Sequence, residues 1–316
     1  MDEFELIRSF WAPLGDVSGA PGIQLGIGDD CAVLDVPQGM ELVQSVDTLV
    51  ESVHFLPEIA PRDLGWRALA VNLSDLAAAG AQPWCFSLAI SLPDLDPQWL
   101  REFSGGLAEL AAQYAIPLVG GDTTRGPCVI SIIVQGLVPK GTALRRKGAR
   151  PGDRIFVSGT LGDAGGALDW LQVEKPPADV GFLLDRYHRP TPRIALGQWL
   201  RGRASACIDI SDGLSADLGH ILASSGVGAN LDSRSIPLSP TLRDTVGSDA
   251  LSLALTAGDD YELCFTWPAD QAMPEDMRER FGVDVAPVGE VVAGSGLSVD
   301  GKEWAAQGYD HFKRQK

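Results

Sequence analysis

Residues 206–214, Ala-Cys-Ile-Asp-Ile-Ser-Asp-Gly-Leu, join a short apolar run to a segment with helical spacing, and the junction carries two acidic residues. The apolar residues at 206–210 predict a strand. Ser211 or Asp212 is a suitable N-cap for a helix that runs to about Ser225. The stretch therefore predicts a strand whose end carries carboxylates, followed directly by a helix.

Acidic loops of this kind recur along the chain, each beside an apolar strand or helix. They are Gly28-Asp29-Asp30, Ser45-Val46-Asp47, Asn72-Leu73-Ser74-Asp75, Gly120-Gly121-Asp122-Thr123-Thr124 and Gly258-Asp259-Asp260-Tyr261-Glu262. The run 42–46 predicts a strand that ends at Asp47, and a later strand is expected to end at Gly120-Gly121-Asp122. Each loop should therefore hold its carboxylates at the end of an element.

The remaining pattern mixes helices and strands. Residues 61–80 and 97–114 predict helices that begin at a proline, and residues 84–91, 128–138 and 154–158 predict strands. Asn72 and Asp75 are three positions apart, hence on one side of the first helix. The order of these elements predicts an α+β fold.

The length of 316 residues suggests about two domains. The best boundary is residues 147–153, where charge, glycine and proline are concentrated between two apolar strands. We therefore expect an N-terminal domain of residues 1–148 and a C-terminal domain of residues 149–316.

Charge and cysteine usage exclude several classes of protein. The formal net charge of −17 argues against a nucleic acid or an anionic membrane as partner, because both are bound through basic patches. No run of about 18 apolar residues predicts a membrane span. The N-terminus is acidic where a signal peptide would be basic, and the 5 cysteines form no CxxC pair. We expect a soluble, cytoplasmic protein.

The main indication of a functional site in the sequence is the set of acidic loops taken together. Any one of them could be a turn or a helix cap. Capping does not require doubled acids such as Asp29-Asp30 and Asp259-Asp260, whose mutual repulsion needs compensation. Mg²⁺ prefers oxygen ligands and usually shares its shell with substrate phosphates. The loops therefore indicate several Mg²⁺ ions and a phosphorylated ligand.

The common nucleotide-binding and hydrolytic motifs are absent from the sequence. It contains no G-x-x-x-x-G-K-[ST], no strand-linked G-x-G-x-x-G, no HExxH and no GxSxG. Gly120-Gly121-Asp122 can offer backbone N–H groups to a phosphate but has no P-loop lysine. A nucleotide must bind by another route.

Several of these stretches resemble the thiamine-monophosphate kinase family, which belongs to the superfamily of aminoimidazole ribonucleotide synthetase and selenophosphate synthetase. The resemblance covers nearly the whole chain. The motifs that carry it are Glu3-Phe4-Glu5-Leu6-Ile7, residues 26–32, 46–55 and 72–80, Gly120-Gly121-Asp122-Thr123-Thr124, residues 209–214, Tyr261-Glu262-Leu263 and Gly308-Tyr309-Asp310-His311-Phe312.

The resemblance implies the two-domain α+β fold of that superfamily. The N-terminal domain would bind ATP and Mg²⁺ and form a homodimer through its sheet. The implied reaction is phosphorylation of thiamine monophosphate to thiamine diphosphate, with ATP as co-substrate and several Mg²⁺ ions. The acceptor phosphate has a second pKa near 6 and is largely ionised at pH 7, so we assign no general base.

The resemblance also implies residue roles. Metal ligands would be Asp30, Ser45, Val46, Asp47, Asp75, Asp122, Asp209 and Asp212. ATP contacts would be Gly121, Asp122, Arg146 and Ser211, and thiamine monophosphate contacts would be His54, Glu262 and Tyr309. Val46 departs from the hydroxyl residue usual in the family, so it could offer a metal only its backbone carbonyl.

Two alternatives remain at this stage. One is another ATP-dependent synthetase of the same superfamily that activates an amide, acyl or selenide group. The other is a metal-dependent, nucleotide-binding scaffold whose acidic loops are structural. Coupled binding of ATP and Mg²⁺ would distinguish an enzyme from such a scaffold.

Overall fold

The computed structural model describes residues 2–305 and residue 308, and it divides the chain into two compact units. The first unit contains residues 1–76 and 81–143, and the second contains residues 77–80 and 144–316. Among the described residues, no helix combines the length and the hydropathy that a membrane crossing requires. Tyr309, a predicted substrate contact, lies outside the described residues.

The first unit is built on a sheet of four strands in the order β3-β6-β4-β5. These are β3 (Met40–Val50), β6 (Val129–Pro139), β4 (Gln82–Leu92) and β5 (Leu118–Arg125). The β3/β6 and β6/β4 pairs are antiparallel, and β4/β5 is parallel. The two edge strands carry predicted site residues, since Asp47 is on β3 and Asp122 on β5.

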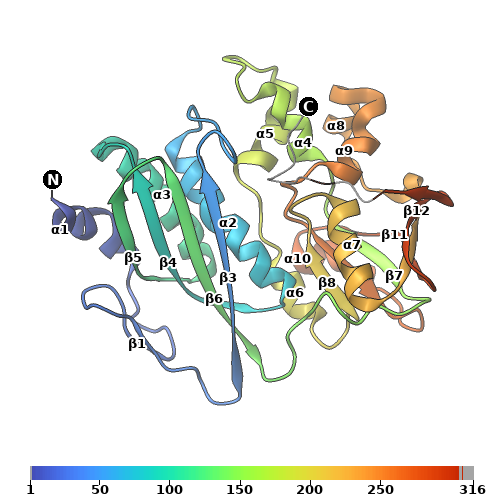
Figure 1. The fold of residues 1–316 in the computed structure, drawn as a ribbon, viewed down its shortest axis with the longest axis horizontal. Coiled ribbons are helices and arrows are strands. Elements are labelled where there is room, and N and C mark those ends of the chain that lie inside the picture. Colours follow the sequence, from blue (N-terminus) through green and yellow to red (C-terminus); the bar gives the residue numbers. More distant parts are fainter. Residues whose placement is uncertain (1, 306–307, 309–316) are drawn as a thin grey trace. The chain divides into compact units, whose positions relative to one another are not determined.

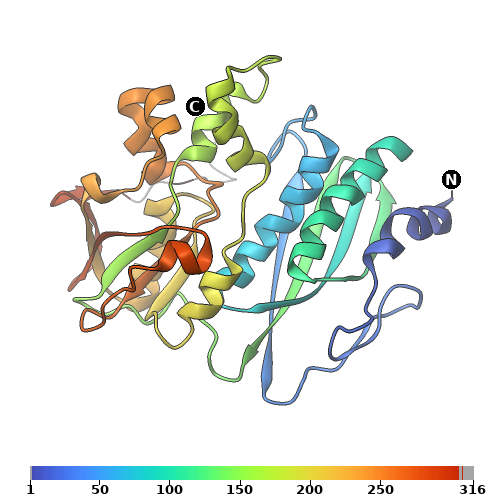
Figure 2. The ribbon, with the colours of Figure 1, turned by 180° about the vertical axis from the view of Figure 1, so that it is seen from behind.

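Two long helices, α2 (Pro61–Ala78) and α3 (Pro97–Tyr114), lie over one face of this sheet (Figures 1 and 2). Each begins with a proline, and the Asp96 side chain caps α3 by accepting from the Gln98 amide. Glycines let the helices approach closely, because a Cβ at Gly106 would lie 1.8 Å from the Arg62 carbonyl oxygen. The predicted helices at 61–80 and 97–114 are thus confirmed.

The first unit begins with short elements that pack at the edge of the sheet. They are α1 (Glu3–Leu6), a π-helical turn (Ile7–Trp11), a 3₁₀ turn (Ala12–Leu14), β1 (Ile23–Leu25) and β2 (Val33–Leu34). Trp11 is buried and donates from Nε1 to Thr123 Oγ1 at 3.1 Å. This bond ties the N-terminal turns to β5.

Two strand ends were predicted wrongly. β3 continues past Asp47 to Val50, and β5 runs straight through Gly120-Gly121-Asp122 to Arg125. The physical reason is that β3 and β5 are edge strands of a sheet with both helices on one face, so polar residues within them still reach solvent. Glycine at position 121 allows the backbones of β5 and β4 to approach closely and does not form a turn, because a Cβ there would lie 1.8 Å from the Leu88 carbonyl oxygen.

The second unit contains a sheet of seven strands in the order β13-β12-β9-β11-β7-β10-β8. Their bounds are β7 (Arg154–Ser158), β8 (Ala206–Asp209), β9 (Gly228–Leu231), β10 (Leu263–Trp267), β11 (Val285–Val292), β12 (Gly296–Val299) and β13 (Lys302–Trp304). The pairs are antiparallel except for β12/β9.

The helices of the second unit are mostly short. They are α4 (Asp163–Ala167), α5 (Gly181–His188), α6 (Ile194–Leu200), α7 (Leu214–Ser225), α8 (Pro240–Val246), α9 (Ala250–Thr256) and α10 (Met277–Phe281), with 3₁₀ turns at Leu168–Trp170, Ala178–Val180, Ser233–Ser235 and Gly247–Asp249. α7 packs through Leu214, Leu218 and Ile221 into the core formed with the sheet.

The start of α7 also differs from the prediction. Its N-cap is Gly213, with φ 113°, and no side chain caps the helix at that position, so neither Ser211 nor Asp212 has the predicted role. The reason lies one turn into the helix. Asp217 Oδ2 accepts hydrogen bonds from the backbone N–H groups of Ser211, Asp212 and Gly213, at 3.0, 3.0 and 3.1 Å.

Candidate active site

In the first unit, β3 and the second half of α2 bring polar side chains together between the sheet and its helices. Ser45 Oγ donates to Asp75 Oδ2 at 2.5 Å. The Asp47 backbone N–H donates to Asn72 Oδ1 at 3.0 Å, and Asn72 is fixed in turn by its bond to the Ala68 carbonyl at 2.9 Å. Two carboxylates and a hydroxyl, all half-buried, thus gather around one contact between a strand and a helix.

Asp122 is not part of that group. In the register of the sheet, Asp122 shares a row with Ala89 of β4, whereas Asp47 shares a row with Leu88. Adjacent residues of a strand point to opposite faces, so Asp47 and Asp122 lie on opposite faces of the sheet. They are also separated by three strand spacings of about 4.8 Å each. Because Asp47 contacts Asn72 of α2, Asp122 lies on the face without the helices, and it is exposed there.

Asp30, the first predicted metal ligand, lies in the loop between β1 and β2. Its side chain is exposed, and its backbone N–H donates to Asp29 Oδ1 at 2.9 Å. The doubled acid is therefore accommodated at the surface, where solvent weakens the repulsion between the two carboxylates.

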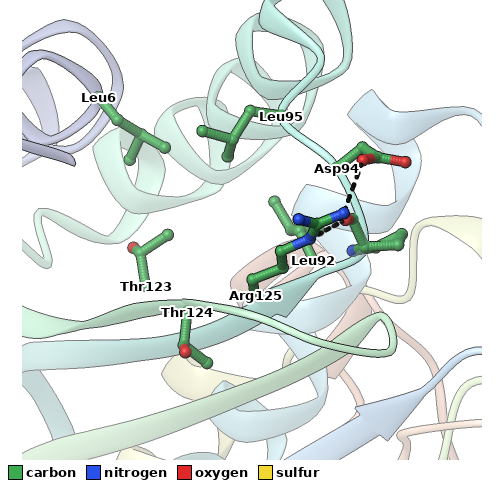
Figure 3. A pocket seen from close by; sticks show the side chains of 8 residues that line it. Leu6, Leu92, Asp94, Leu95, Thr123, Thr124 and Arg125 are labelled. Carbon is green, nitrogen blue, oxygen red and sulfur yellow. Dashed lines mark hydrogen bonds and ion pairs between the residues drawn. The ribbon is translucent and has the colours of Figure 1, made fainter. Parts of the chain in front are cut away.

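A pocket of about 320 Å³ lies at the end of β5, directly after Gly121-Asp122 (Figure 3). It is lined by Leu6, Leu92, Pro93, Asp94, Leu95, Thr123, Thr124 and Arg125. Leu6 and Leu95 point into it from one side and Thr123 from the other. Arg125 lies at its rim, 3.6 Å from Asp94 and donating to the Pro93 carbonyl. The pocket combines apolar walls with a few hydroxyl and charged groups, as small-molecule sites commonly do.

The other predicted ligand contacts differ in their surroundings. His54 is half-buried in a turn after β3, and its Nδ1 accepts from the Val50 backbone N–H at 2.9 Å, so a neutral ring carries its proton on Nε2. Arg146, in the second unit, is exposed in the segment between β6 and β7. It is therefore available to an anionic ligand.

In the second unit, two of the acidic loops lie against each other. The Asp259 backbone N–H donates to the Ser211 carbonyl at 2.9 Å, and that of Tyr261 donates to the Ile210 carbonyl at 2.8 Å. Asp259 and Tyr261 both have positive φ, 70° and 50°, an unusual backbone for a bulky residue that is held here by these contacts. Asp209 is buried at the end of β8. The loops at 209–213 and 258–262 thus form one local group.

Glu262 lies inside the second unit, with its side chain 1% exposed. Its carboxylate accepts from Arg193 Nε at 2.7 Å, from Arg186 Nη2 at 2.9 Å and from Ser158 Oγ at 2.5 Å. Burial alone would raise the pKa of Glu262, but the charges of Arg193 and Arg186 hold it below its ordinary value. Glu262 is therefore a carboxylate whose charge is balanced inside the protein.

Two further acids of this network behave differently. Asp260 is 1% exposed, and burial raises its pKa well above the ordinary value, even though Arg186 lies nearby and the Gly162 amide donates to it at 2.7 Å. Burial also raises the pKa of Asp163, against hydrogen bonds from Ser239 and Thr160. The pair Asp259-Asp260 was expected to need a metal; the structure instead buries Asp260, and this burial disfavours its charged form.

The donor chemistry of the predicted ligands suits Mg²⁺, because it consists of carboxylate, hydroxyl and carbonyl oxygens. Within residues 2–305 and 308, however, no three Asp, Glu, His or Cys side chains gather closely enough to form a complete metal cage. An ion at these residues would complete its shell with phosphate and water oxygens, which is the usual arrangement for Mg²⁺ with a nucleotide.

Family models for the AIR synthase related protein match both parts of the chain, the N-terminal domain model over residues 28–138 and the C-terminal domain model over residues 150–302. The thiamine-monophosphate kinase of Escherichia coli (strain K12) is 46% identical over 322 residues, which covers 98% of each chain. The chain belongs to the thiamine-monophosphate kinase family.

Solved structures agree with this membership. The crystal structure of thiamine-monophosphate kinase from Stenotrophomonas maltophilia K279a has a TM-score of 0.88 and 46% identity, covering 96% of this chain and 98% of that one. AaThiL complexed with AMPPCP and TMP has a TM-score of 0.80 and 33% identity, covering 98% and 97%. The two-domain α+β fold expected for a thiamine-monophosphate kinase is thereby confirmed.

Sequence reasoning missed several residues of this family member that shape the site. Arg186 and Arg193, which neutralise Glu262, lie in a segment broken by prolines where no pattern marks them. Asp217, which holds the loop at 211–213, gives only a weak signal, as an acid in the first turn of a helix. Their roles depend on contacts between segments far apart in the chain.

Proposed function

We propose how this chain performs the reaction of its family, in which ATP phosphorylates thiamine monophosphate to thiamine diphosphate. An oxygen of the acceptor phosphate attacks the γ-phosphorus of ATP, the bond from that phosphorus to the β,γ-bridging oxygen breaks, and ADP leaves. The acceptor is already ionised near pH 7, so no side chain has to remove a proton. The residues have to align and neutralise two anions.

Mg²⁺ is the cation we propose, held in the first unit by Asp30, Ser45, Val46, Asp47, Asp75 and Asp122 and in the second by Asp209 and Asp212. When bound, the ions neutralise charge on the transferred phosphoryl group. The observation that carries this assignment is the half-buried group of Ser45, Asp47 and Asp75, whose oxygens suit a hard cation. Asp122, on the other face of its sheet, would bind a separate ion.

For ATP we propose contacts with Gly121, Asp122, Arg146 and Ser211. The pocket after Asp122 supports a place for the base, because its apolar walls suit an aromatic ring and its volume is in the range of ligand sites. One strand residue spans about 3.3 Å, so Thr123 and Thr124 lie within the reach of a nucleoside whose phosphates contact Gly121. Arg146 would pair with a phosphate.

For thiamine monophosphate we propose contacts with His54, Glu262 and Tyr309. AaThiL, a relative with 33% identity, is complexed with TMP, which supports a site for this substrate in the family. Glu262 is buried and bound to two arginines, which favours an indirect role in substrate binding. Glu262 would hold the surrounding loop in place, and thiamine monophosphate would contact only the edge of that loop.

We also propose a homodimer formed through the sheet of the first unit. Leu42 and Val46 alternate along β3 with Ser45 and Asp47, which contact α2, so they lie on the opposite face. They are 43% and 56% exposed, which supports an apolar contact there. Sedimentation of a Leu42→Glu variant tests it, since the charge should shift the protein to monomers.

A cytoplasmic location is proposed as well, supported by five cysteines that are all free.

The direct test incubates the protein with ATP, Mg²⁺ and thiamine monophosphate and measures thiamine diphosphate by chromatography. Free thiamine serves as the matched acceptor. Its hydroxyl is not ionised at pH 7 and brings no ligand for a cation, so kcat/KM should fall by at least about 1,000-fold. Comparable ADP release with free thiamine would show that the proposed acceptor chemistry is wrong.

A further inference from the structure

Asp217 is a buried acid that the reaction above does not use. It lies in the first turn of α7, is 3% exposed, and its Oδ2 accepts all three consecutive N–H groups of Ser211, Asp212 and Gly213. These are the residues that precede the helix and include the proposed ATP contact Ser211 and the proposed metal ligand Asp212. One carboxylate therefore engages the backbone donors of the whole loop.

The N–H groups at a helix N-terminus have no partner within the helix, and they commonly bind phosphate or another anion. In this chain Asp217 takes that place. An ATP phosphate could not use the same three donors without displacing a buried carboxylate. With the amides of Ser211 and Asp212 engaged by Asp217, these two residues would meet a ligand through oxygen atoms, which suit a cation.

The opposite side of the loop is fixed as well. The Ser211 carbonyl accepts from the Asp259 amide at 2.9 Å. A Cβ on Gly258 would lie 2.1 Å from that carbonyl oxygen, and one on Gly213 would lie 2.8 Å from the Thr256 backbone. The loop is thus held on two sides. Its N–H groups donate to Asp217, and its Ser211 carbonyl accepts from the neighbouring loop.

We infer that Asp217 is a positioning residue of the phosphotransfer site, which makes the start of α7 present oxygens to a cation instead of amides to a phosphate. The inference rests on the proposed roles of Ser211 and Asp212.

The test compares Asp217→Ala and Asp217→Asn with a matched control at Asp153. Asp153 is also buried in the second unit and also holds a turn, accepting from the Arg150 amide at 3.0 Å and from Ser205 Oγ at 2.6 Å. Neither it nor its partners belong to the proposed site. Asp153→Asn therefore reports the effect of losing a buried carboxylate that holds a turn outside the proposed site.

The main measurement is Mn²⁺ binding followed by electron paramagnetic resonance, with and without ATP and in the absence of acceptor. We expect Asp217→Ala to weaken Mn²⁺ binding in the presence of ATP at least tenfold and to speed hydrogen exchange at the amides of 211–213. Asp217→Asn keeps an acceptor oxygen and should lose about threefold. Asp153→Asn should lower the melting temperature while leaving Mn²⁺ affinity within twofold of the wild type.

A second readout follows from the freed amides. Inorganic phosphate should compete with ATP more strongly in Asp217→Ala than in the wild type, by about fivefold in its inhibition constant. If Asp217→Ala does not fold, the Asp217→Asn and Asp153→Asn pair decides the question. Wild-type Mn²⁺ affinity in a folded Asp217 variant overturns the inference. Failure of the wild type to bind Mn²⁺ with ATP overturns the proposed site instead.

Discussion

The predicted metal ligands of the first unit lie at or near the surface, whereas the acidic network around Glu262 in the second unit is buried. Asp47 and Asp75 are half-buried and Asp122 is exposed. Asp260 and Glu262 are 1% and 0% exposed, and Arg186 donates to the Glu262 carboxylate and to the Asp260 backbone carbonyl. Arginine charges inside the protein compensate Glu262, whereas an acid that solvent reaches can bind a cation that arrives with a substrate.

The largest effect we predict is the loss of activity on neutralising an acid of the first unit. Asp75→Asn and Asp122→Asn should each lower kcat/KM by about 1,000-fold, since each removes a cation ligand from the site. The melting temperature should change little, because Asp122 is exposed and the change at Asp75 removes one of two neighbouring negative charges. Kinetics tests the loss of activity, and calorimetry on the same preparations tests the unchanged melting temperature. A variant that unfolds while its folded fraction turns over normally would make that residue structural.

The opposite result is expected at Glu262 in the second unit. Glu262→Gln should lower the free energy of unfolding by about 3 kcal/mol, because it leaves Arg186 and Arg193 buried without their counter-charge. Urea unfolding measures this, and Glu303→Gln, at an exposed position, is the control. A change below about 0.5 kcal/mol would show that the network is not what stabilises this unit.

The pH dependence of stability should also separate the two units. Burial raises the pKa of Asp217 to about 7, whereas the unfolded chain has the ordinary value of 3.8. The folded protein therefore holds a proton that the unfolded chain has released between about pH 4 and pH 7, and stability falls as the pH rises through that window. In chelator, the slope should be up to about 1.4 kcal/mol per pH unit, and Asp217→Asn should flatten it. An unchanged slope in the variant would contradict this assignment.

The smallest effect concerns the pocket of the first unit. Leu95→Trp should fill it and raise the KM for ATP about fivefold, leaving the KM for thiamine monophosphate unchanged, because only the base loses contacts. Leu168→Trp, at a position 54% exposed in the second unit, is the matched control. Equal KM values for ATP in both variants would place the base elsewhere.

Much of the fold could be predicted from sequence because its signals are local. The two helices over the first sheet begin at Pro61 and Pro97 and carry regular apolar spacing, and both were placed within a few residues. The extension of β5 could not be predicted, since Gly120-Gly121 is typical of a turn and only the neighbouring Leu88 backbone explains the glycine. The N-cap predicted for α7 was wrong for a similar reason. The backbone N–H groups that precede the helix donate to Asp217, which lies within the helix.

The site shows the same limit. Sequence reasoning found the acidic loops, but it could not tell which acids would be buried, because burial depends on Arg186 and Arg193 from a distant segment. It therefore assigned the same need for a metal to Asp29-Asp30 and to Asp259-Asp260. The first pair is exposed, and the second includes a buried acid whose pKa burial raises.

One titration tests the central claim that cations bind at the acids of the first unit, whereas Asp260 and Glu262, buried in the second unit, hold no cation. Mn²⁺ binding in the presence of ATP is measured by electron paramagnetic resonance for the wild type, Asp75→Asn and Asp260→Asn. The account predicts that Asp75→Asn binds at least tenfold more weakly and that Asp260→Asn, which replaces a buried acid with no proposed role at the metal, binds as the wild type does. Wild-type affinity in Asp75→Asn, or an equal loss in Asp260→Asn, would contradict it.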